Sequence, residues 1–178
     1  VFRPADANEV AEAYRSSLRN PKQPAVMVLS RQNLPTLDRT NLGPANGVAK
    51  GGYILKEARG GEAECILIGT GSEIPLCLDA ADILESDGIR TRVVSLPCWE
   101  LFAEQDDEYR EHVLPSNIPS RVACEAASGF GWERWLGQKG TFIGMNGFGA
   151  SGPAKKLFEH FGITAEAVVA AARTLVGK

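Results

Sequence analysis

The chain has 178 residues, of which 44% are hydrophobic and 23% charged, and its formal net charge is −3. These values are ordinary for a globular protein and leave room for one sizeable domain and an appendage. The small negative charge provides no basic face for nucleic acid or a membrane surface, and no apolar run approaches the roughly 18 residues of a membrane-spanning helix. We therefore expect neither nucleic acid nor a membrane as a partner. Because the chain starts with Val1 and not with Met, we expect a fragment or a processed product.

The cysteines are not spaced as a metal site or a redox motif. None of them forms a CxxC pair, and the chain has only two histidines to add to them. We expect them to be small core residues in a reducing compartment. The four positions are Cys65, Cys77, Cys98 and Cys124.

The first helix is predicted from its capping residues. Asp6 takes the N-cap position, and Glu9 completes the spacing of a capping box, with Asp in place of Ser or Thr. The helix is expected to end at residues 20–21, Asn-Pro. Its apolar residues recur at i, i+4 and i+8 and share one face: Val10, Tyr14 and Leu18.

Residues 25–29 form a nearly continuous apolar run, as in a parallel strand covered on both faces. This helix and strand cannot bury each other, so they either dock onto a later sheet or end an upstream α/β domain. The Gly- and Pro-rich segment 36–61 is typical of a linker and favours the second alternative. We expect exposed apolar surface at Val26, Val28 and Leu29, and hence a dimer or a disordered start.

A βαβ unit is predicted over residues 64–96. An apolar run at 65–68 ends in a glycine turn, residues 73–87 carry apolar side chains at helical spacing, and 92–96 reads as a second strand. Two strands joined in this way are parallel and their crossover is right-handed.

Strands and helices continue to alternate after this unit. We predict an aromatic-rich loop at 97–102, a charged helix at 105–113, strands at 121–126 and 141–145, a short helical stretch around Trp135, and helices ending at His160 and Leu175. Residues 52–56 can add an edge strand. The predicted fold class is therefore α/β, with a mostly parallel open sheet and helices on both faces over residues 62–178, preceded by an α-β remnant of a second α/β domain.

The turn at 69–72, Gly-Thr-Gly-Ser, resembles a phosphate-binding turn between strand and helix. Ile74 stands where the dinucleotide fingerprint requires glycine, and the second strand ends without an acidic residue. We favour a tight turn capped by Thr70 or Ser72.

The turn at 148–153 is a second candidate anion site, although a solvated pair of Lys155 and Lys156 at a helix start is the favoured interpretation. His112 and His160 have no nucleophile near them, so no catalytic triad is predicted. Aromatic side chains gather in the predicted loops, where they either fill the core or form an interface. They are Trp99, Phe102, Phe130, Trp132, Trp135 and Phe148.

Arg31 follows the apolar run at 25–29, at the carboxyl end of a predicted strand, where open α/β sheets place ligand contacts. A guanidinium there suits a phosphate or a carboxylate. On the residues alone, an ordinary ion pair is the favoured alternative.

Three stretches carry a resemblance to a known family: Ser-Arg-Gln-Asn-Leu-Pro at 30–35, Arg-Val-Val-Ser-Leu-Pro-Cys-Trp-Glu-Leu-Phe at 92–102, and Phe-Gly-Ala-Ser-Gly-Pro at 148–153, followed by Phe-Gly-Ile-Thr at 161–164. Together they resemble the carboxyl-terminal quarter of transketolase, and the resemblance runs along essentially the whole chain. By this match, residues 1–35 end the middle, pyrimidine-binding domain, 36–61 are the linker, and 62–178 are the carboxyl-terminal domain.

The resemblance implies a homodimeric enzyme that moves a two-carbon ketol unit between sugar phosphates in the pentose phosphate and Calvin pathways. It implies thiamine diphosphate and a divalent metal, Mg²⁺ or Ca²⁺, and a cytoplasmic location, or the plastid stroma in a photosynthetic eukaryote. Arg31 matches the family's arginine that binds the substrate phosphate, which overturns the ion-pair alternative.

The family's cofactor-binding, metal-binding and catalytic residues belong to upstream segments, so the resemblance assigns none to this chain. We expect the isolated chain to bind no cofactor and to be inactive. The alternative hypothesis is a non-catalytic α/β interaction or regulatory domain, because related carboxyl-terminal domains keep the fold with other activities.

Overall fold

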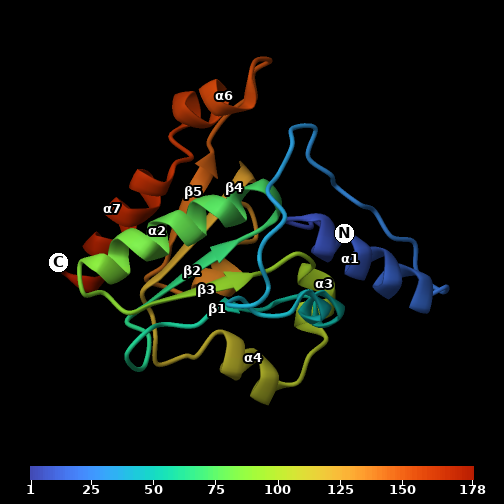
Figure 1. Cartoon of the computed structure of the whole chain (residues 1–178), viewed down its shortest axis with the longest axis horizontal. Coiled ribbons are helices and arrows are strands. Elements are labelled where there is room, and N and C mark those ends of the chain that lie inside the picture. The colour runs from blue at the N-terminus through green and yellow to red at the C-terminus, as the bar shows by residue number, and fades with distance from the viewer.

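The computed structural model describes all 178 residues and contains one five-stranded sheet with the strand order β1-β3-β2-β4-β5 (Figure 1). The edge strand β1 is antiparallel to β3, and the other pairs are parallel. The mostly parallel α/β fold class is therefore confirmed. The strands are β1 (Tyr53–Lys56), β2 (Cys65–Gly69), β3 (Thr91–Ser95), β4 (Arg121–Ser128) and β5 (Thr141–Met145).

The helices connect these strands. Those of the sheet region are α2 (Ile74–Ser86), α3 (Trp99–Ala103), α4 (Asp107–Val113), α5 (Glu133–Leu136), α6 (Ala154–Phe161) and α7 (Ala165–Val176). Short 3₁₀ helices, η1 (Ala45–Lys50) and η2 (Gly71–Glu73), precede β1 and α2, and α1 (Ala7–Arg19) opens the chain. The predicted βαβ unit is confirmed as β2, α2 and β3. The loop predicted at 97–102 is wrong, because α3 begins there, directly after Pro97 and Cys98.

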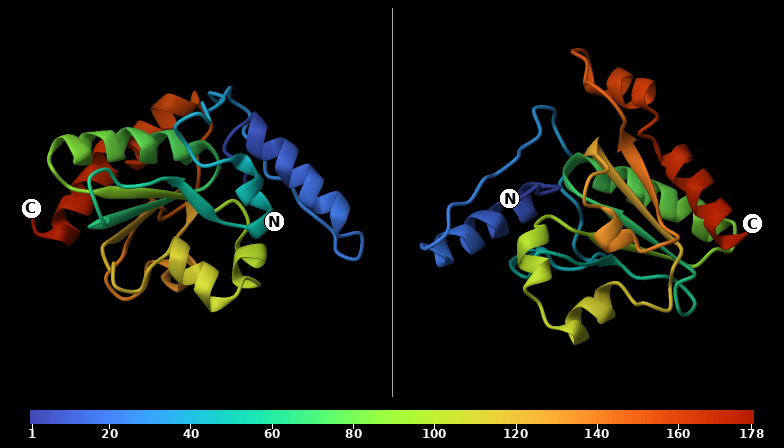
Figure 2. Two further views of the ribbon diagram at one scale, coloured as in Figure 1. Left: turned by 60° about the horizontal axis from the view of Figure 1, so that its bottom comes forward. Right: turned by 180° about the vertical axis from the view of Figure 1, so that it is seen from behind.

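Two hydrophobic cores lie on the two faces of the sheet, because successive strand residues point to opposite sides. In β2, Cys65 and Leu67 belong to the core that α2 and α7 cover, whereas Ile66 and Ile68 belong to the core packed against α3, α4 and α5. Figure 2 shows the sheet between these two groups of helices. Helices on both faces are therefore confirmed.

The N-terminal region, residues 1–44, lies beside the edge where the parallel strands end (Figure 1). Its predicted strand at 25–29 is wrong for this chain, because the segment is extended but only Met27 pairs, in an isolated parallel bridge with Phe2. A parallel strand needs a hydrogen-bonded neighbour along its length, and in this segment only Met27 has such a neighbour. The exposure expected at Val26, Val28 and Leu29 is confirmed, with 57%, 41% and 51% of each residue accessible.

Helix α1 begins as predicted, since the Asp6 carboxylate accepts the Glu9 amide at 2.9 Å. The predicted apolar face is open to solvent, with Tyr14 50% and Leu18 80% exposed. The helix turns Glu9 and Ala13 toward the sheet region. Polar contacts of Glu9 join this helix to the sheet.

The segment 36–61 contains more structure than a linker composition suggests. It includes η1 and the predicted edge strand, β1, which is hydrogen-bonded to β3. Gly51 shows why glycine is required in it: its φ is +82°, and a Cβ there would lie 2.2 Å from the Phe102 amide nitrogen. The division of the chain at residues 35 and 61 stays a prediction.

All four cysteines are free and buried, which confirms that they are core residues. Burial raises the pKa of the Cys65 thiol to about 12, so this thiol is protonated and unreactive at neutral pH. None of the helices is long and apolar enough to cross a membrane.

Candidate functional site

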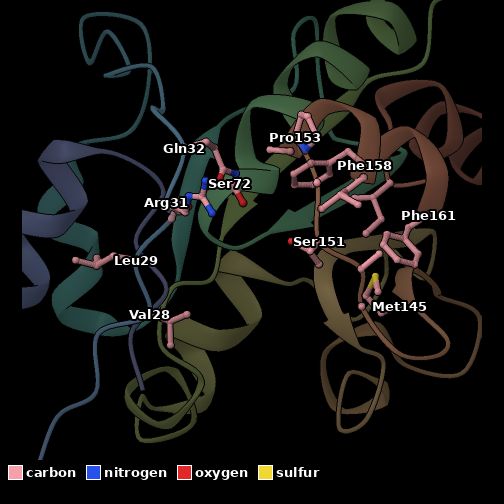
Figure 3. Close-up of a pocket in the computed structure, with 18 of the residues that line it drawn as sticks. Val28, Leu29, Arg31, Gln32, Ser72, Met145, Ser151, Pro153, Phe158 and Phe161 are labelled. Carbon is pink, nitrogen blue, oxygen red and sulfur yellow. The ribbon is translucent and has the colours of Figure 1, made fainter.

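A cleft of about 740 Å³ lies between the N-terminal region and the sheet region (Figure 3). One wall is the segment 28–33, which bends at Arg31 and Gln32, the floor includes Ser72, and the opposite wall runs from Met145 through the 149–153 turn to Phe161. The carboxyl ends of β2, β4 and β5 converge on this edge because the three strands are parallel. This is the position where open α/β sheets bind ligands.

Arg31 lines this cleft and is exposed. In Figure 3 its guanidinium points toward Ser72, with Gln32 beside it and Ser151 on the opposite wall. No carboxylate lies within 4.0 Å of it: the chain's ion pairs, thirteen in number, do not include Arg31, and its side chain makes no hydrogen bond. The ion pair favoured from the residues alone is therefore absent from this chain, and the guanidinium keeps its hydrogen-bond donors unpaired.

The glycine turn at 69–72 is occupied by internal contacts. The Gly71 amide donates to the Arg3 carbonyl at 2.9 Å, and the Thr70 hydroxyl donates to Glu125 at 2.9 Å. A phosphate at this turn would also meet the buried carboxylates of Glu73 and Glu125, which disfavour an anion. The interpretation as a tight structural turn is therefore favoured over a phosphate site.

A buried polar cluster lies behind the turn. Arg3 Nε is 2.8 Å from Glu125 Oε1 and Arg3 Nη2 is 3.5 Å from Glu73 Oε2. The Trp132 indole donates to Glu125 Oε2 at 2.9 Å, and Ser72 donates to Glu73 at 2.6 Å. Burial raises the pKa of Glu73, because its ionised form is desolvated.

A second buried cluster joins α1 to the sheet. The Glu9 carboxylate is fully buried and accepts hydrogen bonds from the Ala5 amide, the Tyr53 hydroxyl and the Ser95 hydroxyl, each at 2.7 Å. Burial raises the pKa of Glu9, although these three donors oppose the shift. Burial and the neighbouring Glu9 charge also raise the pKa of Tyr53.

Arg39 extends this second cluster from the segment predicted as a linker. Its guanidinium lies 3.0 Å from Asp6 and donates to the Tyr53 hydroxyl at 2.8 Å and to the Gly43 carbonyl at 2.9 Å. Sequence reasoning missed the partners in both clusters. The only local sign was the capping spacing of Asp6 and Glu9, which predicted a helix start and not a contact between regions.

The turn at 148–153 does line the cleft, so the structure brings it to the same place as Arg31. Lys155 and Lys156 are exposed and unpaired, as expected of a solvated pair. His112 and His160 are exposed on helices away from any nucleophile.

The aromatic residues divide into a buried group, which fills the core as one alternative predicted, and an exposed group, for which an interface stays a prediction. Phe102, Trp132 and Trp135 are buried and fill the core under α3 to α5, whereas Phe130 and Phe148 are 91% and 100% exposed. The buried side chains pack edge-on or tilted, as Phe102 and Trp135 do at 5.1 Å.

The residues of this chain do not fit a bound metal. No group of three or more His, Cys, Asp and Glu side chains is arranged to hold an ion. Glu125 accepts hydrogen bonds from Thr70 and Trp132 and pairs with Arg3, whereas Glu73 accepts from Ser72 through Oε1 and its buried Oε2 has only the 3.5 Å contact with Arg3.

Comparison with known proteins agrees with the architecture and with the three sequence stretches. Residues 51–164 match the family model described as the transketolase-like TK C-terminal domain. "Transketolase 7" of Craterostigma plantagineum is 53% identical over 178 residues, which is 98% of this chain and 26% of that protein. The chloroplastic transketolase of Solanum tuberosum is 52% identical over 174 residues, covering 97% of this chain and 23% of that one.

A crystal structure of a Pichia stipitis transketolase in complex with sedoheptulose 7-phosphate superposes with a TM-score of 0.88 at 39% identity, over 99% of this chain and 25% of that chain. The chain thus spans about a quarter of the length of its relatives. It belongs to the transketolase family, and its sheet region corresponds to that family's C-terminal domain.

Proposed function

We propose that the protein carrying this chain is a transketolase, which transfers a two-carbon ketol unit between sugar phosphates, and that Arg31 binds the substrate's phosphate group. The observation that carries this proposal is the unpaired guanidinium of Arg31 in a cleft of about 740 Å³, at the edge where the parallel strands end. The Pichia stipitis relative named above was crystallised with a phosphorylated sugar, which is consistent with a phosphate ligand.

Arg31 would act by positioning and not by proton transfer. A guanidinium presents a planar fork of donors to phosphate oxygens, and it stays charged at every physiological pH. Fixing the phosphate end of a sugar restricts where its reactive carbon atoms lie, which lowers the entropic part of the barrier. Ser151 lines the same cleft and offers a hydroxyl group to the rest of the substrate, whereas the Ser72 hydroxyl donates to Glu73.

We propose that thiamine diphosphate and its divalent metal are held by other parts of the protein. When bound, the cofactor supplies the carbanion chemistry of ketol transfer. This chain has no metal-ligand cluster, and its glycine turn at 69–72 is occupied by internal contacts. The isolated chain is accordingly proposed to be inactive and to show no saturable binding of thiamine diphosphate in calorimetry.

The proposed partners are sugar-phosphate substrates and a second protomer. A dimer is favoured by the apolar side chains that the N-terminal region leaves exposed, among them Leu18, Val26 and Leu29. For the compartment we propose the cytoplasm or the plastid stroma. The potato relative is named chloroplastic, and buried free cysteines suit either reducing compartment.

The test is Arg31→Ala in the full-length protein that carries this chain, assayed with phosphorylated and unphosphorylated acceptors. We expect the KM for sugar phosphates to rise about 10- to 100-fold, the worth of charge-assisted hydrogen bonds, with little change for unphosphorylated acceptors. Arg31→Lys should fall between the two, because an ammonium keeps the charge but loses the fork. Arg173→Ala is the matched control, because it removes a surface arginine of α7 that pairs with Asp87 at the end of α2. Equal losses for both acceptor classes would contradict the assignment.

The second candidate is a non-catalytic interaction or regulatory module. The observation in its favour is that Phe148 is completely exposed and Phe130 nearly so. Leaving large apolar side chains in water costs free energy, which a partner would recover by covering them. The same assay separates the two candidates, because a module without a substrate contact predicts no acceptor-dependent effect of Arg31→Ala.

A further inference from the structure

The segment that carries Arg31 is held to the rest of the chain by few bonds. Between Pro24 and Thr36 there are only two hydrogen bonds: the Phe2 amide donates to the Val26 carbonyl and the Val28 amide donates to the Phe2 carbonyl, each at 2.8 Å. Both bonds lead to the same residue. The position of Arg31 therefore depends on how firmly Phe2 is held.

Phe2 is held through its neighbour, Arg3. The Arg3 amide donates to the Pro97 carbonyl at 2.8 Å, beyond the end of β3, and its carbonyl accepts the Gly71 amide at 2.9 Å, beyond the end of β2. The Phe2 side chain is 95% buried in the core beneath α2. Residues 2 and 3 thus connect the carboxyl edge of the sheet to the segment on the other side of the cleft.

The side chain of Arg3 adds the charged part of this connection. Its Nε lies 2.8 Å from Glu125 of β4 and donates to the Thr70 hydroxyl at 3.2 Å, and its Nη2 lies 3.5 Å from Glu73 of η2. Both carboxylates are buried, whereas the Arg3 side chain is 26% exposed and lines the cleft. Removing one partner of a buried ion pair is strongly destabilising, so the pair with Glu125 holds Arg3 in place, and the longer contact with Glu73 adds to it.

We propose that Arg3 is a positioning residue for substrate binding: clamped by Glu125 and Glu73, it fixes the segment 26–28 and thereby places Arg31, at the bend that follows, in the cleft. This inference rests on the phosphate-binding role proposed for Arg31. Arg3 acts through Arg31 and does not itself hold the phosphate, because its Nε and Nη2 face the buried carboxylates.

The kinetic test uses Arg3→Met in the full-length protein, which keeps the apolar stem and removes the charge. We expect the KM for phosphorylated acceptors to rise roughly three- to tenfold, a coupling typical of residues in one hydrogen-bonded network, with unphosphorylated acceptors little affected. The double variant Arg3→Met/Arg31→Ala should be no worse than Arg31→Ala alone. Arg3→Lys should recover part of the loss, since an ammonium can still pair with Glu125. Arg173→Met on α7 is the control for removing an ion-paired arginine.

Additive losses in the double variant would overturn the inference, because Arg3 would then contact the substrate independently of Arg31. An unchanged KM in Arg3→Met would overturn it too. Should Arg3→Met fail to fold, Glu125→Gln tests the same clamp from its other side, and its KM is expected to change in the same acceptor-dependent way.

Hydrogen exchange of the full-length protein separates this inference from the proposed function. Arg3→Met should speed exchange of the Phe2 and Val28 amides at least several-fold while the amides of β2 stay protected. Faster exchange without an effect of Arg31→Ala on phosphorylated acceptors would mean that the proposed phosphate contact is wrong and the clamp is real. Unchanged exchange at both amides would mean that the clamp is wrong, whatever Arg31 does.

Discussion

The two regions of the molecule are held together by different forces. The sheet region encloses two apolar cores, in which strand residues such as Leu67 and Ile68 are fully buried. The N-terminal region buries few apolar side chains, and six of the nine large hydrophobic residues that the chain exposes lie within its first 29 residues. It is attached instead through the carboxylates of Glu9, Glu73 and Glu125 and their donors.

The two kinds of attachment have different consequences for the cleft. Hydrophobic burial is non-directional, so it can stabilise a sheet without fixing the orientation of a loosely attached segment. Buried hydrogen-bonded charges are directional, and they are costly whenever their geometry is lost. The walls of the cleft are therefore placed relative to each other by the polar clusters, and the apolar cores provide the rigid support beneath them.

The largest effect is expected from Leu67→Ala, in the middle of β2. This side chain is fully buried, and its truncation should lower the free energy of unfolding by about 2–5 kcal/mol. Denaturant unfolding of the chain measures the loss. Leu18→Ala is the matched truncation in the N-terminal region and should change stability by less than about 0.5 kcal/mol, because Leu18 is 80% exposed. Similar losses in the two variants would refute the contrast between the regions.

Glu9→Ala should produce the next largest effect, confined to the attachment of α1. It leaves the Ala5 amide and the hydroxyls of Tyr53 and Ser95 without their buried acceptor, at a cost of about 1–3 kcal/mol. Hydrogen exchange should then rise in α1 while β2 stays protected. Glu12→Ala removes a carboxylate from the same helix without touching the sheet and serves as the control. Equal deprotection of α1 and β2 would show that the two regions unfold as one unit.

Most of the sheet could be predicted from the sequence because its signals are local. Apolar runs and helical spacing located β2, α2 and β3, and Asp6 marked the start of α1. The prediction of a strand at 25–29 failed because a strand forms only beside another strand, and the apolar pattern of a segment does not show whether such a neighbour is present. The prediction of a loop at 97–102 failed because the helix found there, α3, has five residues and is too short to show a periodic pattern.

The candidate site was only partly predictable, for a related reason. Arg31 could be singled out because it follows an apolar extended segment. The partners that hold its wall are 67 residues apart, in the case of Arg3 and Thr70, or 86 residues apart, in the case of Glu9 and Ser95. A single sequence carries no spacing rule for contacts at such separations, so the clusters emerge only from the fold.

The polar attachment should also respond to pH in a definite direction. Burial raises the pKa of both Glu9 and Glu73 above the ordinary value of 4.5. The folded state therefore binds more protons than the unfolded state once the pH exceeds about 4.5, and stability should fall as the pH rises from there through the raised pKa values. The slope is at most about 1.4 kcal/mol per pH unit for each group. Glu9→Gln should flatten it, as measured by denaturant midpoints across that range, and an unaltered slope would contradict the assignment to Glu9.

The smallest effect on stability is expected from polar substitutions on the exposed apolar surface of the N-terminal region. Leu18→Glu and Val26→Glu each replace a side chain that already contacts water, so the free energy of unfolding should change by less than about 0.5 kcal/mol. Their effect should appear in association instead, because exposed apolar patches favour contact with another copy. Light scattering of the isolated chain over a range of concentrations should show a higher average mass for the unmodified chain than for the double variant. Lys22→Glu, in the exposed turn that follows α1, is the charge-matched control. If the unmodified chain and the double variant had the same mass at every concentration, this surface would not drive association, and the contrast between the regions would rest on the polar clusters alone.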